Sequence, residues 1–154
     1  MVKHTHCYLC AKPLTDPLSV DHVPPLLFFP KEMRRKYNID KLLTVPVHAA
    51  CNLAYQFDEE YFVHTLLPMT RGSEAGNAHH FRIRDKLRKG KNAALVNKVL
   101  EEFTHKVRGV YLPPTRVAKL IDHGRFFRVL WKIIRGLHYH HTREILPEEW
   151  GMRY

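Results

Sequence analysis

Two short stretches decide the fold of this chain: Cys7-Tyr8-Leu9-Cys10 near its start and His48-Ala49-Ala50-Cys51 further along. In each stretch two side chains that bind metals are separated by two residues, which is the spacing of structural zinc sites. The chain has three cysteines, an odd number that suits a disulfide framework poorly, and the two pairs use all of them. The sequence therefore predicts one structural Zn²⁺ per chain, bound by Cys7, Cys10, His48 and Cys51. His4 and His6 flank Cys7, and either could replace His48 as the fourth ligand.

The hydrophobic pattern around these pairs predicts a strand, a long connection, a second strand and a helix. Residues 18–23 resemble a short strand closed by prolines, and residues 42–45 are expected to form a second strand that Pro46 interrupts. Apolar residues recur at helical spacing from 49 to 67. Within that helix, the acidic run Asp58-Glu59-Glu60 is expected to be a solvated surface rather than a set of metal ligands.

A glycine-containing loop is expected to separate residues 1–70 from residues 71–154. The second part is expected to be mainly helical. One helix is predicted over 92–108, and another from Pro113-Pro114-Thr115 to the residue before Gly136. The predicted fold class is α+β: a zinc-bearing module followed by a basic, mostly helical one.

Positive charge is concentrated in the second part. The formal net charge is +10, and residues 71–154 contain eighteen Lys/Arg against eight Asp/Glu, which accounts for all of it. Such an excess is typical of a protein that binds a polyanion, and DNA is the expected partner, with RNA as an alternative. The candidate contacts with the phosphate backbone form one stripe of the last predicted helix: Arg125, Arg128, Lys132 and Arg135. The other interpretation of this stripe is an ordinary solvated face.

Nothing in the sequence predicts a membrane protein. No apolar run approaches the roughly 20 residues of a membrane span, and Met1 to Cys7 contain no apolar signal region. A cytoplasmic location is the resulting expectation. The apolar side of the last predicted helix could serve a homodimer as well as a core.

Two further motifs carry a family resemblance. Asp21-His22 lies between the two zinc pairs, and Asn52 directly follows Cys51. This order resembles the zinc-bearing branch of the HNH (ββα-metal, His-Me finger) endonuclease superfamily, over roughly residues 7–56. The stretches Asp21-His22-Val23-Pro24-Pro25 and Asp58-Glu59-Glu60-Tyr61-Phe62 also resemble the corresponding stretches of a group of bacterial HNH proteins of unassigned role.

The resemblance implies a ββα-metal module that hydrolyses phosphodiester bonds in DNA with weak sequence preference. His22 would be the general base, since an imidazole titrates close to neutral pH. Asp21 and Asn52 would hold one catalytic Mg²⁺ or Mn²⁺ through oxygen ligands, separate from the structural zinc. Two other interpretations stay open: a non-catalytic zinc-knuckle protein that binds nucleic acid, and a scaffold that retains a degenerate HNH shape.

The chain departs from the family pattern at three places. His48 stands where many members have cysteine, which zinc accepts readily, and Tyr55 stands where many have lysine. The middle asparagine of the family would fall near Leu43, and Asn38 and Asp40 are the closest polar residues. The rigidity of the loop beneath the predicted base depends on that position.

Overall fold

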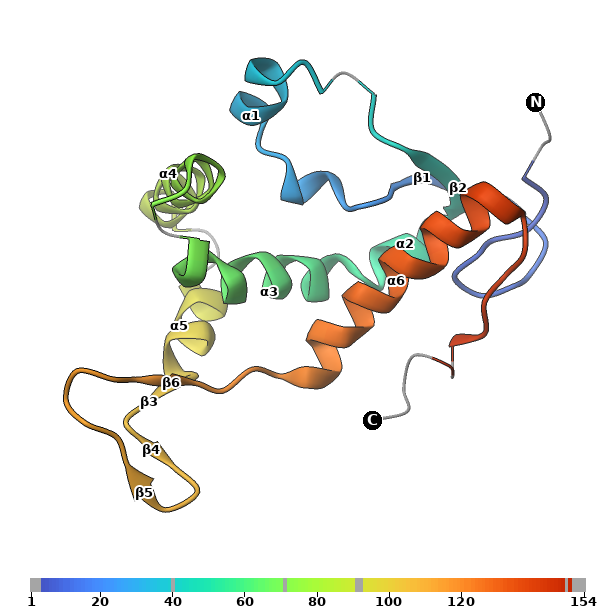
Figure 1. Ribbon diagram of the computed structural model, residues 1–154. Coiled ribbons are helices and arrows are strands. Elements are labelled where there is room, and N and C mark those ends of the chain that lie inside the picture. The colour runs from blue at the N-terminus through green and yellow to red at the C-terminus, as the bar shows by residue number, and fades with distance from the viewer. Residues whose placement is uncertain (1–3, 40, 71, 91–92, 149, 151–154) are drawn as a thin grey trace.

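The computed structural model describes residues 4–39, 41–70, 72–90, 93–148 and 150, and its fold is α+β (Figure 1). The described residues form helices and three two-stranded antiparallel sheets. Their bounds, with η for 3-10 helices, are β1 Leu18–His22, η1 Leu26–Phe28, α1 Lys31–Lys36, β2 Thr44–His48, α2 Ala49–Leu53, α3 Gln56–Leu66, η2 Leu67–Thr70, α4 Glu74–Arg88, α5 Ala93–Glu101, β3 Phe103–Thr104, β4 Lys106–Val107, β5 Val110–Tyr111, β6 Ala118–Lys119 and α6 His123–Thr142.

Strands β1 and β2 pair so that Asp21 lies opposite Val45. Strand β1 forms where it is predicted, but β2 runs through Pro46 instead of being interrupted by it. Proline is tolerated in a two-stranded sheet because each strand has one edge where a backbone N–H needs no partner strand. Since side chains alternate along a strand, Val45 and Val47 both point into the core, where they are fully buried.

The predicted helix over 49–67 is two helices, α2 and α3, separated by a turn at residues 54–55. The predicted helix over 92–108 ends earlier, at Glu101. After it the chain forms four short strands, with β3 paired to β6 and β4 paired to β5. Arg108 and Gly109, between β4 and β5, both have positive φ angles, of 48° and 86°, as a tight hairpin turn of the primed type requires. A turn of this kind reverses the chain and excludes a helix that continues to residue 108.

Helix α6 differs from its predicted bounds at both ends. It begins after Asp122, whose side chain accepts a hydrogen bond from the Arg125 backbone N–H at 3.2 Å, and not at Thr115. It also continues through Gly136, so the predicted stop there is wrong. Gly136 has a packing role instead: a Cβ atom at this position would lie 2.7 Å from Cγ2 of Val23. Glycine lets α6 approach the end of β1 more closely than any other residue would allow.

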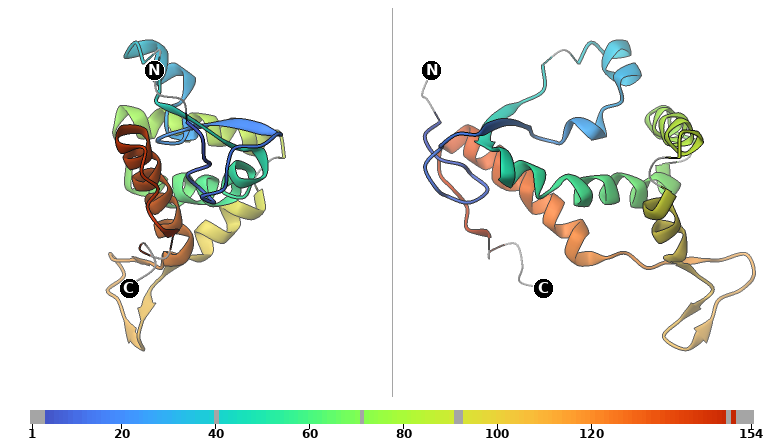
Figure 2. Two further views of the ribbon diagram at one scale, coloured as in Figure 1. Left: turned by 90° about the vertical axis from the view of Figure 1, so that its right-hand side faces the viewer. Right: turned by 180° about the vertical axis from the view of Figure 1, so that it is seen from behind.

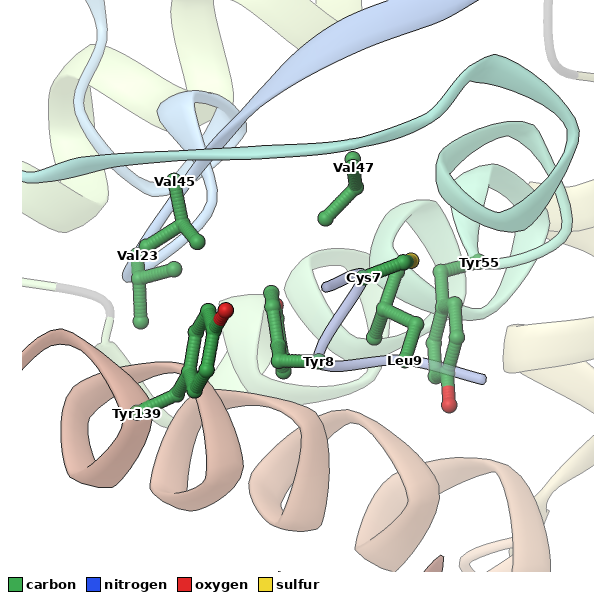
Figure 3. Close-up of a cluster of buried hydrophobic side chains, with 8 residues drawn as sticks. All are labelled: Cys7, Tyr8, Leu9, Val23, Val45, Val47, Tyr55 and Tyr139. Atoms are coloured by element: carbon green, nitrogen blue, oxygen red, sulfur yellow. The ribbon is translucent and has the colours of Figure 1, made fainter. Parts of the chain in front are cut away.

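The hydrophobic core lies between the β1–β2 hairpin and α6 (Figure 3). The segment with Cys7, Tyr8 and Leu9 runs through its middle, with Val47 and Val45 of β2 on one side and Tyr139 of α6 on the other. Tyr139 donates a hydrogen bond from its hydroxyl to the backbone carbonyl of His6, at 2.9 Å. Helix α6 therefore packs with the first part of the chain, although it lies far beyond the boundary expected at residue 70.

At the other end of the molecule, β3 to β6 form an extension that projects away from the helices (Figures 1 and 2). Helices α3 and α6 lie in contact with each other. In the described ranges, no helix combines the length and the apolar composition that crossing a membrane requires.

Candidate metal centre

The four predicted zinc ligands come together at the hairpin end of the molecule. One ligand atom from each of Cys7, Cys10, His48 and Cys51 lies within 4.8 Å of all the others. His48 Nδ1 is 3.3 Å from Cys10 Sγ and 3.9 Å from Cys51 Sγ. Around a tetrahedral zinc ion with Zn–S bonds of about 2.3 Å, ligand atoms are separated by about 3.8 Å. The cluster is therefore of the right size and composition to hold a metal ion such as zinc.

The orientation of His48 supports its role as the fourth ligand. Its Nε2 lies 2.9 Å from the backbone carbonyl oxygen of Pro13 and, at the longer distance of 3.2 Å, from the backbone N of Thr15. When Nε2 carries the proton and donates to that oxygen, the lone pair of Nδ1 is left to face the thiols, which is the usual outer contact of a metal-bound histidine. The alternative ligands are not in the cluster. His4, for example, lies against Arg143, with its Nε2 2.7 Å from Nη1 of the guanidinium.

Local backbone structure explains how each pair is presented. The first pair lies on a turn in which the Ala11 backbone N–H donates to the Cys7 carbonyl at 2.8 Å, with Ala11 at a φ of 60°. The second pair spans the junction of β2 and α2, because His48 is the N-cap of α2 and Cys51 lies within that helix. A metal ion bound here would fix the first turn of α2 against the N-terminal segment.

The thiols differ in how readily they ionise. Burial raises the pKa of the Cys10 thiol, but hydrogen bonds from the Lys12 backbone, His48 and the neighbouring thiols outweigh burial and lower it to about 7. Burial, together with the hydrogen bond to Cys10, raises the pKa of Cys51 to about 12. Crowded thiols resist multiple ionisation without a cation, and a bound metal ion supplies the positive charge that removes this resistance.

Asp21 lies on the inner face of the hairpin and is only 3% exposed. The Tyr8 hydroxyl donates to its Oδ2, and Lys132 Nζ donates to its Oδ1 at 2.8 Å. Burial and the adjacent Asp21 carboxylate both raise the pKa of the Tyr8 hydroxyl, so it stays a neutral donor. Both oxygens of the predicted metal ligand therefore have partners within the protein.

Asn52 and His22 lie on different sides of β1. Asn52 Nδ2 donates to Oγ of Ser19 at 3.1 Å, and Ser19 shares the inner face of β1 with Asp21 because the two are two residues apart. His22 is the neighbour of Asp21 in the strand and so points to the opposite face, where it is half-buried. The structure brings Asn52 onto the strand that carries Asp21. A joint catalytic role for the three residues stays a prediction.

Half of the stripe on α6 is buried, whereas the Arg128 side chain is 41% exposed and that of Arg125 is 26% exposed. Lys132 is 1% exposed and Arg135 is 3% exposed, so the prediction that they lie along a phosphate backbone is wrong. Lys132 Nζ contacts both Asp21 and Glu59, and Arg135 donates from Nη2 to the Tyr8 carbonyl at 2.6 Å. Lys132 can be buried because two carboxylates pair with it, and Arg135 because backbone carbonyls accept its hydrogen bonds.

Asp58 completes this charged seam, as we name the contact of α6 with Asp21, Asp58 and Glu59. Arg125 Nε and Arg128 Nη1 donate to the two carboxylate oxygens of Asp58, at 2.7 Å and 2.5 Å. Asp58 is buried and Glu59 half-buried, so the predicted solvated acidic surface is wrong for these two residues. Burial raises the pKa of the Glu59 carboxyl, and Lys132 offsets this only in part.

The sequence contains part of a signal for the seam. The cations of α6 follow helical spacing and form one stripe, and α3 carries a run of acids, Asp58-Glu59-Glu60, that can supply partners of opposite charge. The run is consecutive, so helical spacing does not indicate which of its acids face α6. Asp21 lies on a strand, so helical spacing gives no sign of its part in the seam.

Near Leu43, where the resemblance would place a middle asparagine, the structure has a backbone hydrogen bond. The Val23 N–H donates to the Leu43 carbonyl at 3.0 Å, which joins the segments just beyond the paired ends of β1 and β2. Asn38 follows α1 with a positive φ of 50°, and Asp40 lies outside the described residues.

Comparison of the chain with protein-family models, with curated proteins and with solved structures gave no match. What the protein does is therefore inferred from its own residues.

Proposed function

We propose that this protein is a metal-dependent nuclease of the HNH type, in which the zinc cluster is structural. The observation that carries the proposal is the hydrogen bond from Asn52 to Ser19, directly beside the four clustered ligands. It ties the start of α2 to the strand that ends in Asp21-His22, which supports a shared role of Asn52 and Asp21 on one face of that strand. Because Asn52 donates through Nδ2, its carbonyl oxygen Oδ1 is the atom left to bind a cation.

Each residue then has a chemical task. Asp21 and Asn52 would hold Mg²⁺ or Mn²⁺ through hard oxygen ligands, and this ion would offset charge on the leaving oxygen of the phosphodiester. His22 would take the proton from the attacking water, a step that contributes about 10²- to 10⁴-fold in rate. The cluster of Cys7, Cys10, His48 and Cys51 would keep the strand and the helix at a fixed separation.

The proposal makes two structural demands. His22 points to the opposite face of β1 from Asp21 and must turn toward the ion to act as the base. The second demand concerns Asp21. A carboxylate oxygen has two lone pairs, so Oδ1 of Asp21 can accept a second partner besides Lys132. Asp21 is buried, however, and Lys132 Nζ must move aside for a hydrated ion to reach it. Glu59, which also contacts Lys132, offers the ammonium group an acceptor while it moves.

A nicking assay tests the proposal. Supercoiled plasmid is incubated with the protein and Mg²⁺ or Mn²⁺, and wild type is compared with His22→Ala and with His141→Ala, a matched change of an exposed histidine on α6. We expect wild type and His141→Ala to nick the plasmid and His22→Ala to be at least about 10²-fold slower, as the loss of a general base predicts. Equal residual nicking by all three proteins would point to a contaminating nuclease and overturn the proposal.

A second candidate function is nucleic-acid binding without catalysis. The buried ion pair of Asp21 with Lys132 favours it, because it neutralises the predicted metal ligand. The two candidates differ in one outcome of the same assay. If wild type retards the plasmid in a gel but nicks it with neither Mg²⁺ nor Mn²⁺, the protein is a binding module with a closed HNH-like site.

A further inference from the structure

Residues 103–120 form an extension, which we name the arm. The proposed reaction gives it no role. It leaves the end of α5, reverses at Arg108-Gly109 and returns to the start of α6. In all three views it projects from the body of the molecule (Figures 1 and 2). Its outer half is a ribbon of two strands, β4 and β5.

The base of the arm is firmly anchored. Lys119 Nζ binds Oε2 of Glu102 in an ion pair whose side chains are 10% and 11% exposed. The same carboxylate accepts hydrogen bonds from the Tyr61 hydroxyl and from Thr65 Oγ1 of α3. The Leu120 N–H donates to the Glu102 carbonyl at 2.8 Å. These contacts fix the direction in which the arm projects, so its tip is presented in one orientation.

The charge of the arm has one sign. From Phe103 to Ile121 the sequence contains no aspartate and no glutamate. Lys119 is neutralised at the base, but Lys106, Arg108 and Arg116 are exposed. In contrast to the cations of the charged seam, these three have no carboxylate partner among the ion pairs of the described residues.

The tip also exposes apolar surface. Val110 is 67% exposed and Tyr111 is 74% exposed, and Lys106 Nζ lies 5.0 Å from the centre of the Tyr111 ring. Large exposed apolar side chains on a projecting element are typical of a contact surface. Cations interleaved with an aromatic ring indicate a partner that offers both negative charge and flat apolar groups, as nucleic acids do.

We propose that the arm enters a groove of duplex DNA. The major groove is about 12 Å wide and admits a two-stranded β-ribbon. In this arrangement Lys106, Arg108 and Arg116 pair with phosphates along the groove, while Tyr111 contacts its floor and Val110 lies on the other face of the ribbon. The inference rests on the proposed function for the choice of DNA, and it replaces the α6 stripe as the predicted binding surface.

Binding to a labelled duplex, followed by fluorescence anisotropy without divalent metal, tests the arm separately from cleavage. All proteins carry His22→Ala. The triple variant Lys106→Ala/Arg108→Ala/Arg116→Ala is compared with Lys12→Ala/Arg35→Ala/Lys41→Ala, which removes the same charge from exposed positions elsewhere. We expect the arm variant to bind at least tenfold more weakly and its salt dependence to fall by about 0.9 in slope for each phosphate that the protein no longer neutralises. Equal affinities of the two triple variants would overturn the inference.

Two further measurements fix the nature of the partner. Tyr111→Ser removes no charge, and we expect it to weaken duplex binding several-fold with an unchanged salt slope. A single strand of the same sequence and vesicles that contain phosphatidylserine serve as competitors. Arm-dependent binding to the vesicles or to the single strand in preference to the duplex would overturn the inference. Arm-dependent duplex binding without any plasmid nicking would overturn only the nuclease proposal, and nicking with arm-independent binding would overturn only the arm.

Discussion

Helix α6 and the arm both carry rows of cations, but they use them in opposite ways. Lys132 and Arg135 are almost fully buried and contact carboxylates and backbone carbonyls, whereas Arg108 and Arg116 are exposed. The difference comes from the neighbours. Helix α6 lies against Asp21 and the acids of α3, while the arm contains no acidic residue and projects away from the helices.

This contrast shows that net charge alone does not locate a polyanion-binding surface. A cation inside the protein stabilises the fold through the acid that it pairs with, and removing one partner leaves the other charged group buried and uncompensated. An exposed cation contributes little to stability and remains free for a ligand. Substitutions in the two regions should therefore affect different measurements, stability in one and affinity in the other.

The largest effect is expected from a change in the cluster of Cys7, Cys10, His48 and Cys51, which lies in the region against which α6 packs. His48→Ala should abolish zinc binding and unfold the segment around Cys7 and Tyr8, because binding of a structural zinc is coupled to folding and contributes on the order of 10 kcal/mol. Zinc content by mass spectrometry and thermal unfolding would measure it. His6→Ala is the matched control and should keep about one zinc per chain, the number that one four-ligand site implies. If the His48→Ala protein kept its zinc and the His6→Ala protein lost it, His6 and not His48 would be the fourth ligand.

Lys132→Ala is expected to have the next largest effect, through the charged seam. It leaves Asp21 and Glu59 facing each other without a cation, and the loss of one partner from a buried ion pair costs about 3–5 kcal/mol. Urea denaturation would measure it, with Lys106→Ala in the arm as the control that leaves the midpoint unchanged.

A second substitution of Lys132 tests whether Asp21 can bind the proposed catalytic metal. In a Lys132→Met protein the carboxylates of Asp21 and Glu59 have no internal cation, and we expect Mn²⁺ to raise the melting temperature of this variant more than that of wild type. A Lys132→Met protein as stable as wild type in metal-free buffer would show that the seam does not hold α6 in place.

A smaller effect is expected at Gly136, where α6 touches the core. In Gly136→Ala the new methyl group would lie 2.7 Å from Val23 and 3.1 Å from the Tyr8 ring, and overpacking of this kind costs about 1–3 kcal/mol. Gly124→Ala in the same helix meets only Asp122, at 3.6 Å, and should be neutral or slightly stabilising because alanine favours helix more than glycine does. Equal melting temperatures for the two variants would contradict the close packing.

The Cys/His cluster and the β1–β2–α2 order could be predicted because each leaves a local pattern in the sequence. Two spaced pairs of ligands are readable in the sequence, and the structure clusters all four residues. Alternation and closing prolines predict strand β1, and the mixture of strand and helical patterns predicts the α+β class. Within each ligand pair and within each strand, the residues that carry the signal are neighbours in sequence.

The burial of the α6 stripe could not be predicted from one helix alone. Its partners, such as Asp21 and Asp58, lie 70 or more residues away from Arg128 and Lys132. Helical spacing does not indicate which face of α6 packs inward, because the apolar face can pack in a core and the cationic face can pair with acids. Gly136 resembles a helix stop unless the close approach of Val23 is known. The arm is not predictable from hydrophobic pattern, because its strands are only two residues long and the preceding apolar residues suit a helix.

The hydroxyl of Tyr139 and the ammonium of Lys132 have a bearing on how the chain is made. Their partners, His6 and Asp21, precede them by 133 and 111 residues. During synthesis, the turn with Cys7 and Cys10 and the strands β1 and β2 leave the ribosome before α6. At that stage Lys132, the cation that pairs with buried Asp21, has not yet been made. The core around these two partners therefore closes only after α6 has been made, and we expect truncation within α6 to leave Asp21 without its cation.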